Sequence, residues 1–553
     1  MKSTASYSFN TSFWHRTIRS RLCIVLPTLL LLFSARGTSF AGSATWQLNP
    51  TSGDWNTAAN WMPSTDGSVP NGPFDTATFG PSYVTGVSLS VETIVNAIVF
   101  NDANASAFTI NTESLVLRIF GAGVINHSGI TQNIIAGSPF GLISFLNNST
   151  AGIDVTYTIE PDPTNGQGFG GSIFFNGSST AGDATFLFPE NTVSNGNGGF
   201  ILFDDFATAG TGKFNVSGGV GSLAHGARIE FGTKSNADRG TFTVNGGNGS
   251  DFLGGGTVGF FQSSGAGAAT LIANGGSFGG PGGLIEFADH SHGGSARIKI
   301  FGNGSLDISG HKDLKVTVGS LEGSGLVLLG SSNLRVGRND LDTVFSGSIH
   351  DGGLAGGAGG SLTKIGRGKL VLRRRSAYTG GTIVRHGKLM VNNLGGSGTG
   401  TGPVQVEGGQ LGGKGRIAGA VTIGTGSGAG AALSPGYLHG IGRPGALTIQ
   451  SSLIFNSDAI YRMELSSSNV TADGVIAGGV TINVGAQFTF NDIGSAILPP
   501  GTTFTVINNT VATPIGGTFS NLADGATFTY NGNSYRVDYE GGDGNDLTLT
   551  VVP

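Results

Sequence analysis

The sequence has little cysteine, little charge and few long apolar runs. Its one cysteine is Cys23, so a framework of disulfide bonds is excluded. Charged residues make up only 11% of the 553 positions. The longest apolar run, Leu22–Phe33, is too short to cross a bilayer, and no later stretch predicts a membrane-spanning helix.

The N-terminal segment has the pattern of a secretory signal. Residues 1–21 contain four basic residues and no acidic one, and the apolar run Leu22–Phe33 follows. Ser39 and Ala41 are small residues at the two positions that signal peptidase reads, so we expect residues 1–41 to be a signal peptide. A signal anchor that is never cut is the alternative. The expected location is therefore secreted, at the cell surface or associated with the outer membrane, with no transmembrane segment after cleavage.

Cleavage would also remove the only cysteine and five basic residues. The remaining chain has 24 basic and 34 acidic side chains, a net charge of −10, and this balance predicts no nucleic-acid partner. Cys23 lies at the start of the apolar run instead of following it, which argues against a lipid anchor.

Glycine and phenylalanine are abundant. Glycine accounts for 99 residues, without the strict three-residue period of collagen. The 35 phenylalanines, together with Val, Ile and Leu, are too many for a disordered linker. Glycine-rich turns between short β-branched and aromatic runs favour many short strands.

Two columns of large apolar residues repeat about every 28 positions. The first is Phe175, Phe203, Phe231, Phe260 and Phe287, and the second, 11 residues later each time, is Phe186, Phe214, Phe242, Leu271 and Ile298. Such a period is typical of solenoids, because one turn cannot bury its own inward side chains. We predict an all-β fold, a right-handed parallel β-helix (solenoid) of about 28 residues per rung, with an N-terminal cap and C-terminal antiparallel closing strands.

The β-helix region is expected over residues 81–446, with regular repeats over 141–305. Each unit should hold three short strands: one such as Gly171–Phe175, a second such as Gly240–Val244 after a polar turn, and a weaker third such as Asn274–Phe278. At about 28 residues per rung, roughly 12 rungs would give a rod about 60 Å long.

Residues 42–80 and 447–553 are expected to close the two ends of the rod. The first segment holds Trp46, Trp55 and Trp61 close together in the sequence, which suits a lid over the apolar end of a solenoid. A sugar-binding aromatic platform is the alternative. The second segment is richer in Phe, Thr and Val and contains hairpin signals.

Residues 361–392 contain three linked motifs. They read Ser361-Leu362-Thr363-Lys364-Ile365-Gly366-Arg367-Gly368-Lys369-Leu370, then Tyr378-Thr379-Gly380-Gly381-Thr382, then Gly387-Lys388-Leu389-Met390-Val391. This stretch resembles the autotransporter-associated β-strand repeat, also called the passenger-associated transport repeat. The resemblance implies an exported, surface-associated β-helical protein, similar to secreted repeat proteins of planctomycete- and verrucomicrobia-like bacteria.

Two features depart from that pattern. Autotransporters end in a translocating barrel, and no such domain is expected here, so self-export is not predicted. The chain stops at Val551–Pro553, where the Pro-Glu-Pro sorting tail of the similar secreted proteins would begin. A passenger exported by a separate barrel partner is an alternative.

The acidic residues form no evident catalytic set. One column places Glu230 and Glu286 two rungs apart, about 10 Å, just beyond the carboxylate spacing of inverting glycosidases. Asp205 and Asp289 share another column, and the neighbours Asp204 and Asp205 point to opposite faces of a strand. We expect these acids to be solvated and the protein not to be an enzyme; a polysaccharide-active β-helix lyase or hydrolase is the alternative.

Two segments have the residue types of metal sites. Asp289–His292 could place two imidazoles on one face of a strand, but no third ligand follows from the sequence. Gly541–Leu549 resembles the calcium-binding nonapeptide of repeat toxins, but it occurs once and has Thr548 where the large apolar residue belongs. No metal or cofactor is expected.

The basic residues are unevenly distributed. Eight of the 24 expected in the mature chain fall between Ser361 and Met390, with no acidic residue among them: Lys364, Arg367, Lys369, Arg373, Arg374, Arg375, Arg385 and Lys388. Gathered on one face, they would hold an anionic glycan or lipopolysaccharide. Long polar side chains on an exposed face are the alternative.

The expected function is that of an exported, non-enzymatic β-solenoid that serves as a surface or extracellular structural or adhesion protein. Its partners would be glycans or other cell-surface polymers, bound through many weak contacts along a face rich in Ser, Thr and Asn.

Overall fold

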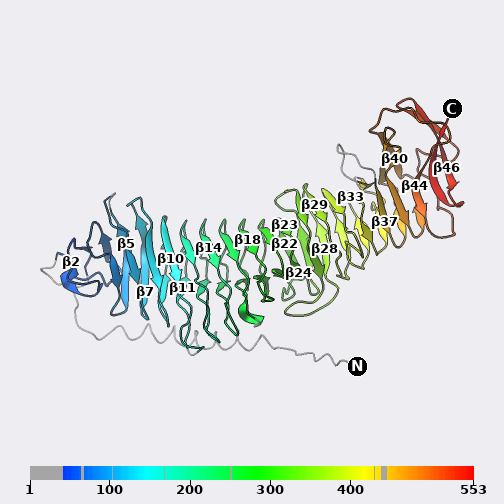
Figure 1. Cartoon of the computed structure of the whole chain (residues 1–553). Helices are drawn as coiled ribbons and strands as arrows, with labels where there is room; N and C mark the ends of the chain where they lie inside the picture. The colour runs from blue at the N-terminus through cyan, green and yellow to red at the C-terminus, as the bar shows by residue number, and fades with distance from the viewer. Residues whose placement is uncertain are drawn as a thin grey trace, which may run out of the picture.

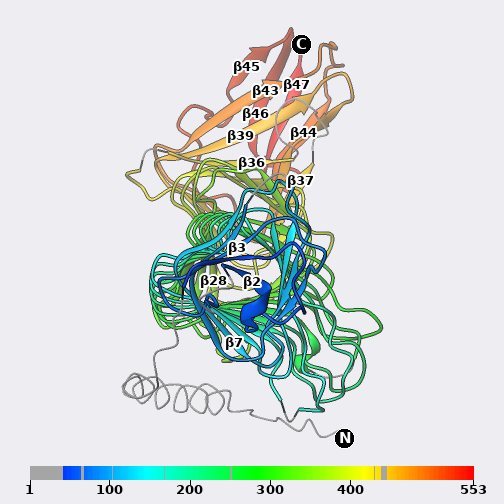
Figure 2. The same cartoon turned by 90° about the vertical axis from the view of Figure 1, so that its left-hand side faces the viewer.

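The computed structural model is a long rod built almost entirely of β-strands (Figure 1). Viewed along the rod, successive turns of the chain lie over one another (Figure 2). The structure describes residues 42–63, 68–101, 104–166, 168–249, 252–428, 430–436 and 445–553. The predicted signal peptide, residues 1–41, lies outside them. No helix among the described residues has the length and apolar character needed to cross a membrane.

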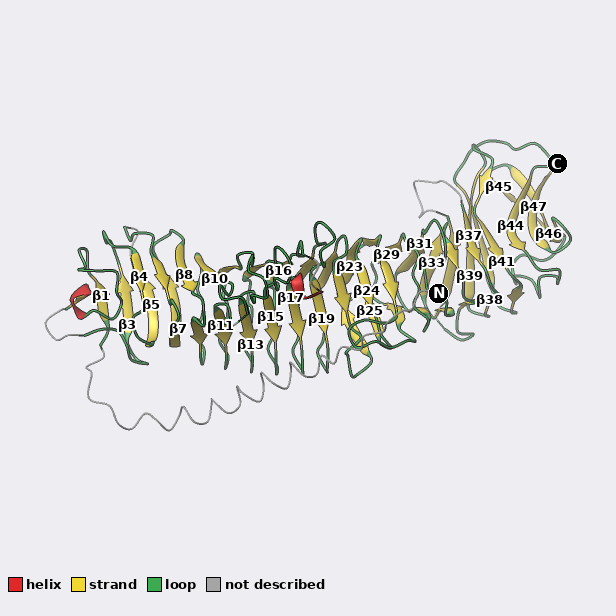
Figure 3. Ribbon diagram, turned by 60° about the horizontal axis from the view of Figure 1, so that its bottom comes forward, coloured by secondary structure: helices red, strands yellow, loops and turns green. Residues whose placement is uncertain are grey.

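Strands from successive turns pair into four ladders that run along the rod (Figure 3). The first ladder is parallel except for the pairing of its two N-terminal strands. In spatial order it contains β2 (Trp61–Met62), β1 (Ala44–Trp46), β3 (Thr76–Phe79), β5 (Thr93–Phe100), β7 (Val116–Asn126), β9 (Leu142–Phe145), β11 (Ser172–Phe175), β13 (Phe200–Phe203), β15 (Arg228–Phe231), β17 (Thr257–Phe260), β19 (Leu284–Phe287), β21 (Ser305–Asp307), β24 (Leu326–Leu328) and β27 (Ser348–His350).

The second ladder runs through nearly the whole described chain. Its parallel strands are β4 (Gly86–Ser88), β6 (Thr109–Asn111), β8 (Gln132–Ala136), β10 (Val155–Ile159), β12 (Thr185–Leu187), β14 (Lys213–Val216), β16 (Thr241–Val244), β18 (Thr270–Ala273), β20 (Arg297–Ile300), β23 (Ser320–Gly323), β26 (Thr343–Phe345), β29 (Lys369–Leu372), β31 (Lys388–Val391), β33 (Gly409–Gly413), β36 (Ala431–Pro435), β39 (Ala459–Ser466) and β43 (Gln487–Asp492). A short strand, β40 (Thr471–Ala472), pairs antiparallel with β39.

Two further ladders belong to the C-terminal half. The third contains β22 (Lys315–Val318), β25 (Asn333–Val336), β28 (Ser361–Lys364), β30 (Thr382–Val384), β32 (Val404–Val406), β35 (Val421–Ile423), β38 (Leu453–Phe455) and β42 (Val480–Ile482). The fourth contains β34 (Arg416–Ile417), β37 (Ala446–Ile449), β41 (Gly474–Ala477), β44 (Thr503–Asn509), β47 (Asp546–Val552), β46 (Asn533–Gly541) and β45 (Thr527–Tyr530). Two 3₁₀ turns, η1 (Ala58–Asn60) and η2 (Phe252–Gly254), are the only helical segments described. The predicted all-β parallel solenoid is confirmed.

Two stacks of aromatic rings fill the core of the regular repeats. The first stack is Phe145, Phe175, Phe203, Phe231, Phe260 and Phe287, with ring centroids 4.6 to 4.8 Å apart. The second is Tyr157, Phe186, Phe214 and Phe242, at 4.4 to 5.0 Å. Across the core the stacks meet edge to face, as where Phe231 lies 5.7 Å from Phe242 at 75°. Because the ring spacing equals the spacing between paired strands, the same register satisfies the hydrogen bonds and the ring contacts.

Turns of the predicted length follow one another without interruption in the regular repeats. From Phe145 to Phe287, each residue of the first stack pairs in register with the next one. Beyond them the turns become distinctly shorter, since Glu286 pairs with Asp307 and Asp307 with Leu328. Later turns of the second ladder vary in length. As a result, the second ladder holds seventeen parallel strands within the described chain, about 77 Å from end to end, which exceeds the roughly 12 rungs predicted.

The third strand predicted in each regular unit is not formed, since Asn274–Phe278 lies in a loop. The polar turn between the two strands instead carries a column of single bridges between turns, which links Thr150, Thr180, Thr208, Asn236, Gly265 and His292.

Left-handed corners also connect neighbouring turns. Asp205 and Asp289 have φ of 54° and 53°, a conformation that Asp adopts more readily than most residues. The carboxylate of Asp205 accepts a hydrogen bond from the Gly177 N–H at 3.0 Å, and that of Asp289 accepts one from the Gln262 N–H at 3.1 Å. The column shared by these two acids thus reflects corner geometry.

The N-terminal tryptophans form a buried lid. Trp46, Trp55 and Trp61 are at most 2% exposed, and each lies 5.5 to 5.9 Å from the ring of Phe79. Every one of the three indole N–H groups donates to a backbone carbonyl. A sugar-binding aromatic platform needs exposed rings, so that alternative is excluded for these tryptophans.

An antiparallel sheet closes the C-terminal end of the rod, as predicted. It consists of β44, β47, β46 and β45. The link between β45 and β46 is a two-residue hairpin turn at Asn531 and Gly532, whose φ values of 47° and 77° fit a type I′ turn.

Replacing one ring of the first stack with a charge should destabilise the rod strongly. Phe231→Asp places a carboxylate between two stacked rings in a fully buried position, and we expect a loss of about 4 kcal/mol or more in unfolding free energy. Urea titration followed by circular dichroism measures this. The matched control is Phe278→Asp, because Phe278 is 96% exposed and its φ of 50° suits Asp. Equal stability of the two variants would show that the stack is not structural.

Candidate functional site

The eight basic residues predicted to form one patch lie in two separate places. Lys364, Arg367, Lys369, Arg385 and Lys388 flank the corner where the chain passes from the third ladder to the second. The remaining three, Arg373, Arg374 and Arg375, follow β29 on the far side of the second ladder. The structure therefore divides the predicted patch.

Lys364 is not a surface residue. Its side chain is 2% exposed, and its ammonium donates to the carbonyls of Ile365, Gly366 and His386. Burial lowers the pKa of Lys364 to about 8. Lys364 thus links its own corner to the next turn through these hydrogen bonds, and its ammonium cannot reach a large ligand.

Acidic residues from neighbouring turns accompany Lys369 and Arg385 at this corner. Lys369 lies 3.5 Å from the carboxylate of Asp342, and the guanidinium of Arg385 lies 2.8 Å from Glu407. The Lys369 N–H also donates to Asp342 at 2.7 Å, and that hydrogen bond, with the nearby lysines, lowers the pKa of Asp342. Asp342 and Glu407 lie outside residues 361–390 in the sequence. A count of charges within that segment therefore shows only basic residues, although the fold supplies acidic partners for two of them.

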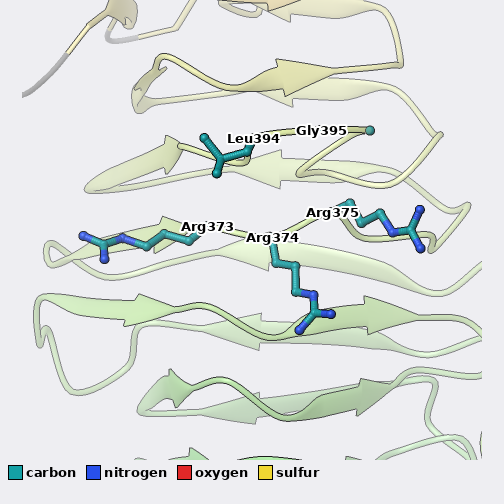
Figure 4. Close-up of a pocket in the computed structure, with 6 residues that line it drawn as sticks. Arg373, Arg374, Arg375, Leu394 and Gly395 are labelled. Carbon is teal, nitrogen blue, oxygen red and sulfur yellow. The ribbon is translucent and has the colours of Figure 1, made fainter.

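The three consecutive arginines are exposed and have no such partners. Within the described residues, none of the guanidiniums of Arg373, Arg374 and Arg375 has an acidic group within 4.0 Å. Together with Leu394, Gly395 and Gly396, they line an open depression of about 400 Å³. Figure 4 shows their side chains fanning out, with Arg373 and Arg375 pointing to opposite sides and Arg374 toward the preceding turn.

A second depression adjoins the first. It measures about 260 Å³, shares Arg375 and Gly396 with the first, and extends to His350. Its other lining residues are Ser376, Ala377 and Ser397. The two depressions thus form one continuous surface that crosses several turns of the rod; we refer to these lining residues together as the arginine surface.

The remaining motif residues of 361–392 serve the fold. Tyr378 is fully buried and its hydroxyl is 2.5 Å from the Thr382 hydroxyl. Gly366 has a φ of 67°, and a Cβ there would lie 1.8 Å from the Gly337 carbonyl oxygen of the preceding turn. Only glycine permits both the backbone conformation and the close approach.

The structure brings together an acidic pair, Glu286 and Asp307, that sequence reasoning missed. Glu286 pairs in register with Asp307 on the outward face of the first ladder, so the two residues lie on adjacent turns, about 4.8 Å apart. The regular period of the sequence would have placed another residue beside Glu286. Glu230, the partner considered from the sequence, is two turns away and lies 2.6 Å from its neighbour Arg228.

Glu286 and Asp307 have different surroundings. Asp307 is 1% exposed and accepts hydrogen bonds from the Ser309 hydroxyl and from the Ser309 and Leu354 N–H groups. Glu286 is partly buried, and burial raises its pKa to about 7, with the charges of Asp307 and Glu230 adding to the shift. Asp307 thus holds the loop around Leu354 in place. Glu286 stays protonated at pH values at which a glutamate in water is already ionised.

The two segments with metal-site residue types do not assemble into metal sites. His290 lies 2.8 Å from Asp313, while His292 belongs to the column of bridges between turns. Gly541–Leu549 forms the hairpin between β46 and β47, where Asp546 accepts a hydrogen bond from the Asn509 N–H. Among the described residues, only Asp524, Asp538 and Glu540 bring three potential ligand groups within 4.8 Å; Asp524 and Glu540 are exposed, and Asp538 is half-buried.

No family model matches this sequence, and no curated protein matches it either.

Removing the buried ammonium should loosen the corner that it holds. Lys364→Met leaves three backbone carbonyls without their donor, so we expect a loss of about 1–3 kcal/mol in unfolding free energy. Arg374→Met is the matched control, since its side chain is exposed, and its effect should stay within about 0.5 kcal/mol. Denaturant titration measures both; unchanged stability of the Lys364 variant would contradict the role assigned to its hydrogen bonds.

Stability should fall as the pH rises through the titration of Glu286. Because its folded-state pKa is raised, the folded chain holds a proton that the unfolded chain has released above about pH 4.5. The contribution is complete below that pH and is lost as the pH passes about 7, on the order of 3 kcal/mol in total. Unfolding curves of wild type and Glu286→Gln between pH 5 and 8 test this. The Gln variant should lose this part of the pH dependence, whereas Glu190→Gln, at an exposed position, should keep it.

Proposed function

We propose that this chain is an exported, non-enzymatic β-solenoid that acts as a structural and adhesive element at the cell surface or outside the cell. The observation that carries this proposal is the contrast between its inside and its outside. The core is a series of stacked apolar columns, whereas the described residues that line the two open depressions include no carboxylate and no set of groups able to act together on a substrate.

Polar side chains repeat along the outside of the rod, which supports contact with extended polymers. The amides of Asn215, Asn245 and Asn274 bond to one another from turn to turn at 2.8 and 2.9 Å. Thr208 and Thr180 are joined in the same way at 3.0 Å. Such rows repeat one weak binding group at a fixed spacing, and many weak contacts add to high avidity.

Export rests on the sequence. The pattern of residues 1–41 fits a cleaved signal peptide, and residues 361–392 resemble a repeat of exported passengers. A separate barrel partner is the alternative route to the surface. Fractionation of cells that express the full chain, with N-terminal sequencing of the product, tests this: a product that starts at Gly42 outside the cytoplasm is expected, and an uncut cytoplasmic chain would refute export.

The Glu286–Asp307 pair favours one other candidate function, a polysaccharide-active enzyme. A protonated carboxyl beside a second carboxyl is the arrangement used for general acid catalysis. The three hydrogen bonds that tie Asp307 to Ser309 and Leu354 argue for a structural role instead.

A binding and turnover screen separates the two functions. The full chain is incubated with a panel of neutral and acidic polysaccharides, and both retention on a glycan array and release of new reducing ends are measured. Binding without turnover is expected. Release of products that is abolished by Glu286→Gln and preserved in Glu190→Gln would establish the enzyme and overturn the non-enzymatic proposal.

A further inference from the structure

We propose that the arginine surface binds an acidic polysaccharide, a chain whose sugars carry carboxylate or sulfate groups. This inference builds on the proposed function, because it names the class of partner and the place of contact. Its starting observation is the set of three exposed, consecutive arginines whose guanidiniums have no acidic partner within 4.0 Å among the described residues.

Several arginines elsewhere on the rod have an acidic partner within 4.0 Å. Arg118 lies 3.0 Å from Glu92, Arg297 lies 2.6 Å from Glu322, and Arg385 lies 2.8 Å from Glu407. Three neighbouring arginines instead create a local positive potential on a chain whose overall charge is negative. The guanidinium fork matches carboxylate and sulfate oxygens in two parallel hydrogen bonds, which makes an anionic group the natural partner.

The arrangement of the side chains favours a polymer over a single small anion. The guanidiniums diverge instead of converging on one point (Figure 4). They would therefore contact charged groups placed at intervals along a chain. The two adjoining depressions continue the surface from Leu394 to His350, so that an extended ligand can lie across several turns.

Leu394 and the two glycines beside it offer an apolar surface to the faces of sugar rings. Leu394 is 97% exposed, and the neighbouring Gly395 and Gly396 leave the backbone uncovered. The loop is also fixed before binding: the buried Asn393 amide donates to the carbonyls of both glycines at 3.1 and 3.0 Å, and its oxygen accepts from the Arg416 N–H. A loop held in this way loses little conformational entropy when a ligand binds.

The surface is equipped for binding and not for turnover. Among the described residues that line it, none carries a carboxyl group. A general acid and base pair is therefore missing from this lining.

The test compares two variants of equal net charge. In one, Arg373, Arg374 and Arg375 are replaced by Ala; in the other, Arg367, Arg385 and Lys388 are replaced by Ala, which removes three cations from the other corner. Binding of fluorescent polygalacturonate and dextran sulfate to the full chain is measured by anisotropy at physiological ionic strength, with neutral dextran as the uncharged control. Vesicles containing anionic phospholipid are measured in parallel.

We expect the first variant to bind both acidic polymers about 10- to 100-fold more weakly than wild type and the second to bind nearly as wild type does. Equal losses in the two variants would show non-specific charge attraction and overturn the proposal. So would wild-type binding that is absent, that is equal for neutral dextran, or that is found for vesicles alone. If the arginine surface does not bind acidic polymers, the proposed structural and adhesive function is not refuted. Release of sugar products would refute the non-enzymatic function, but it would not bear on binding at the arginine surface.

Discussion

The parallel register between turns is the constraint on which the rest of the structure depends. Each strand bonds to the equivalent strand one turn away, which places equivalent side chains about 4.8 Å apart along the rod. A residue in the core must therefore pack well against the equivalent residues in the turns above and below. Flat rings such as those of Phe203 and Phe231 do so, with their centroids 4.6 Å apart. Corners obey the same rule, since Asp205 and Asp289 each reach back to the turn before. Stability is distributed along the rod, because each turn is held chiefly by its neighbours.

The sequence was sufficient where the register leaves a periodic trace. The phenylalanine columns predicted the inward faces, and the clustered tryptophans predicted a lid, because large apolar side chains that repeat at a fixed period or gather in the sequence are most often buried. The sequence was insufficient where the turn length changes. After Phe287 a shorter turn brings Asp307 beside Glu286, and the regular period does not reveal this pair. Asp342 and Glu407 likewise come from other turns, so the balance of charge around the lysine and arginine that they accompany could not be read from residues 361–390 alone.

The outside of the rod is free of these restrictions. Side chains that point away from the core need only be compatible with solvent, so the corners can carry charge, loops or exposed aliphatic groups without disturbing the stacking. The arginine surface uses this freedom. Arg373, Arg374 and Arg375 directly follow β29, a strand whose inward residues Leu370 and Leu372 are buried. The buried strand β29 thus fixes the position of these three charged residues along the rod.

The closed ends of the rod have a consequence for its length. At one end the tryptophan lid covers the first turns, and at the other an antiparallel sheet replaces the parallel ladders, so neither end of the described chain presents a flat parallel edge on which another copy could stack. The number of turns is then set by the chain itself. Gain or loss of a whole turn would change the distance between the two ends by one step of about 4.8 Å, while a fraction of a turn would misalign every column beyond it. The length of the rod can therefore change in evolution only in steps of one whole turn.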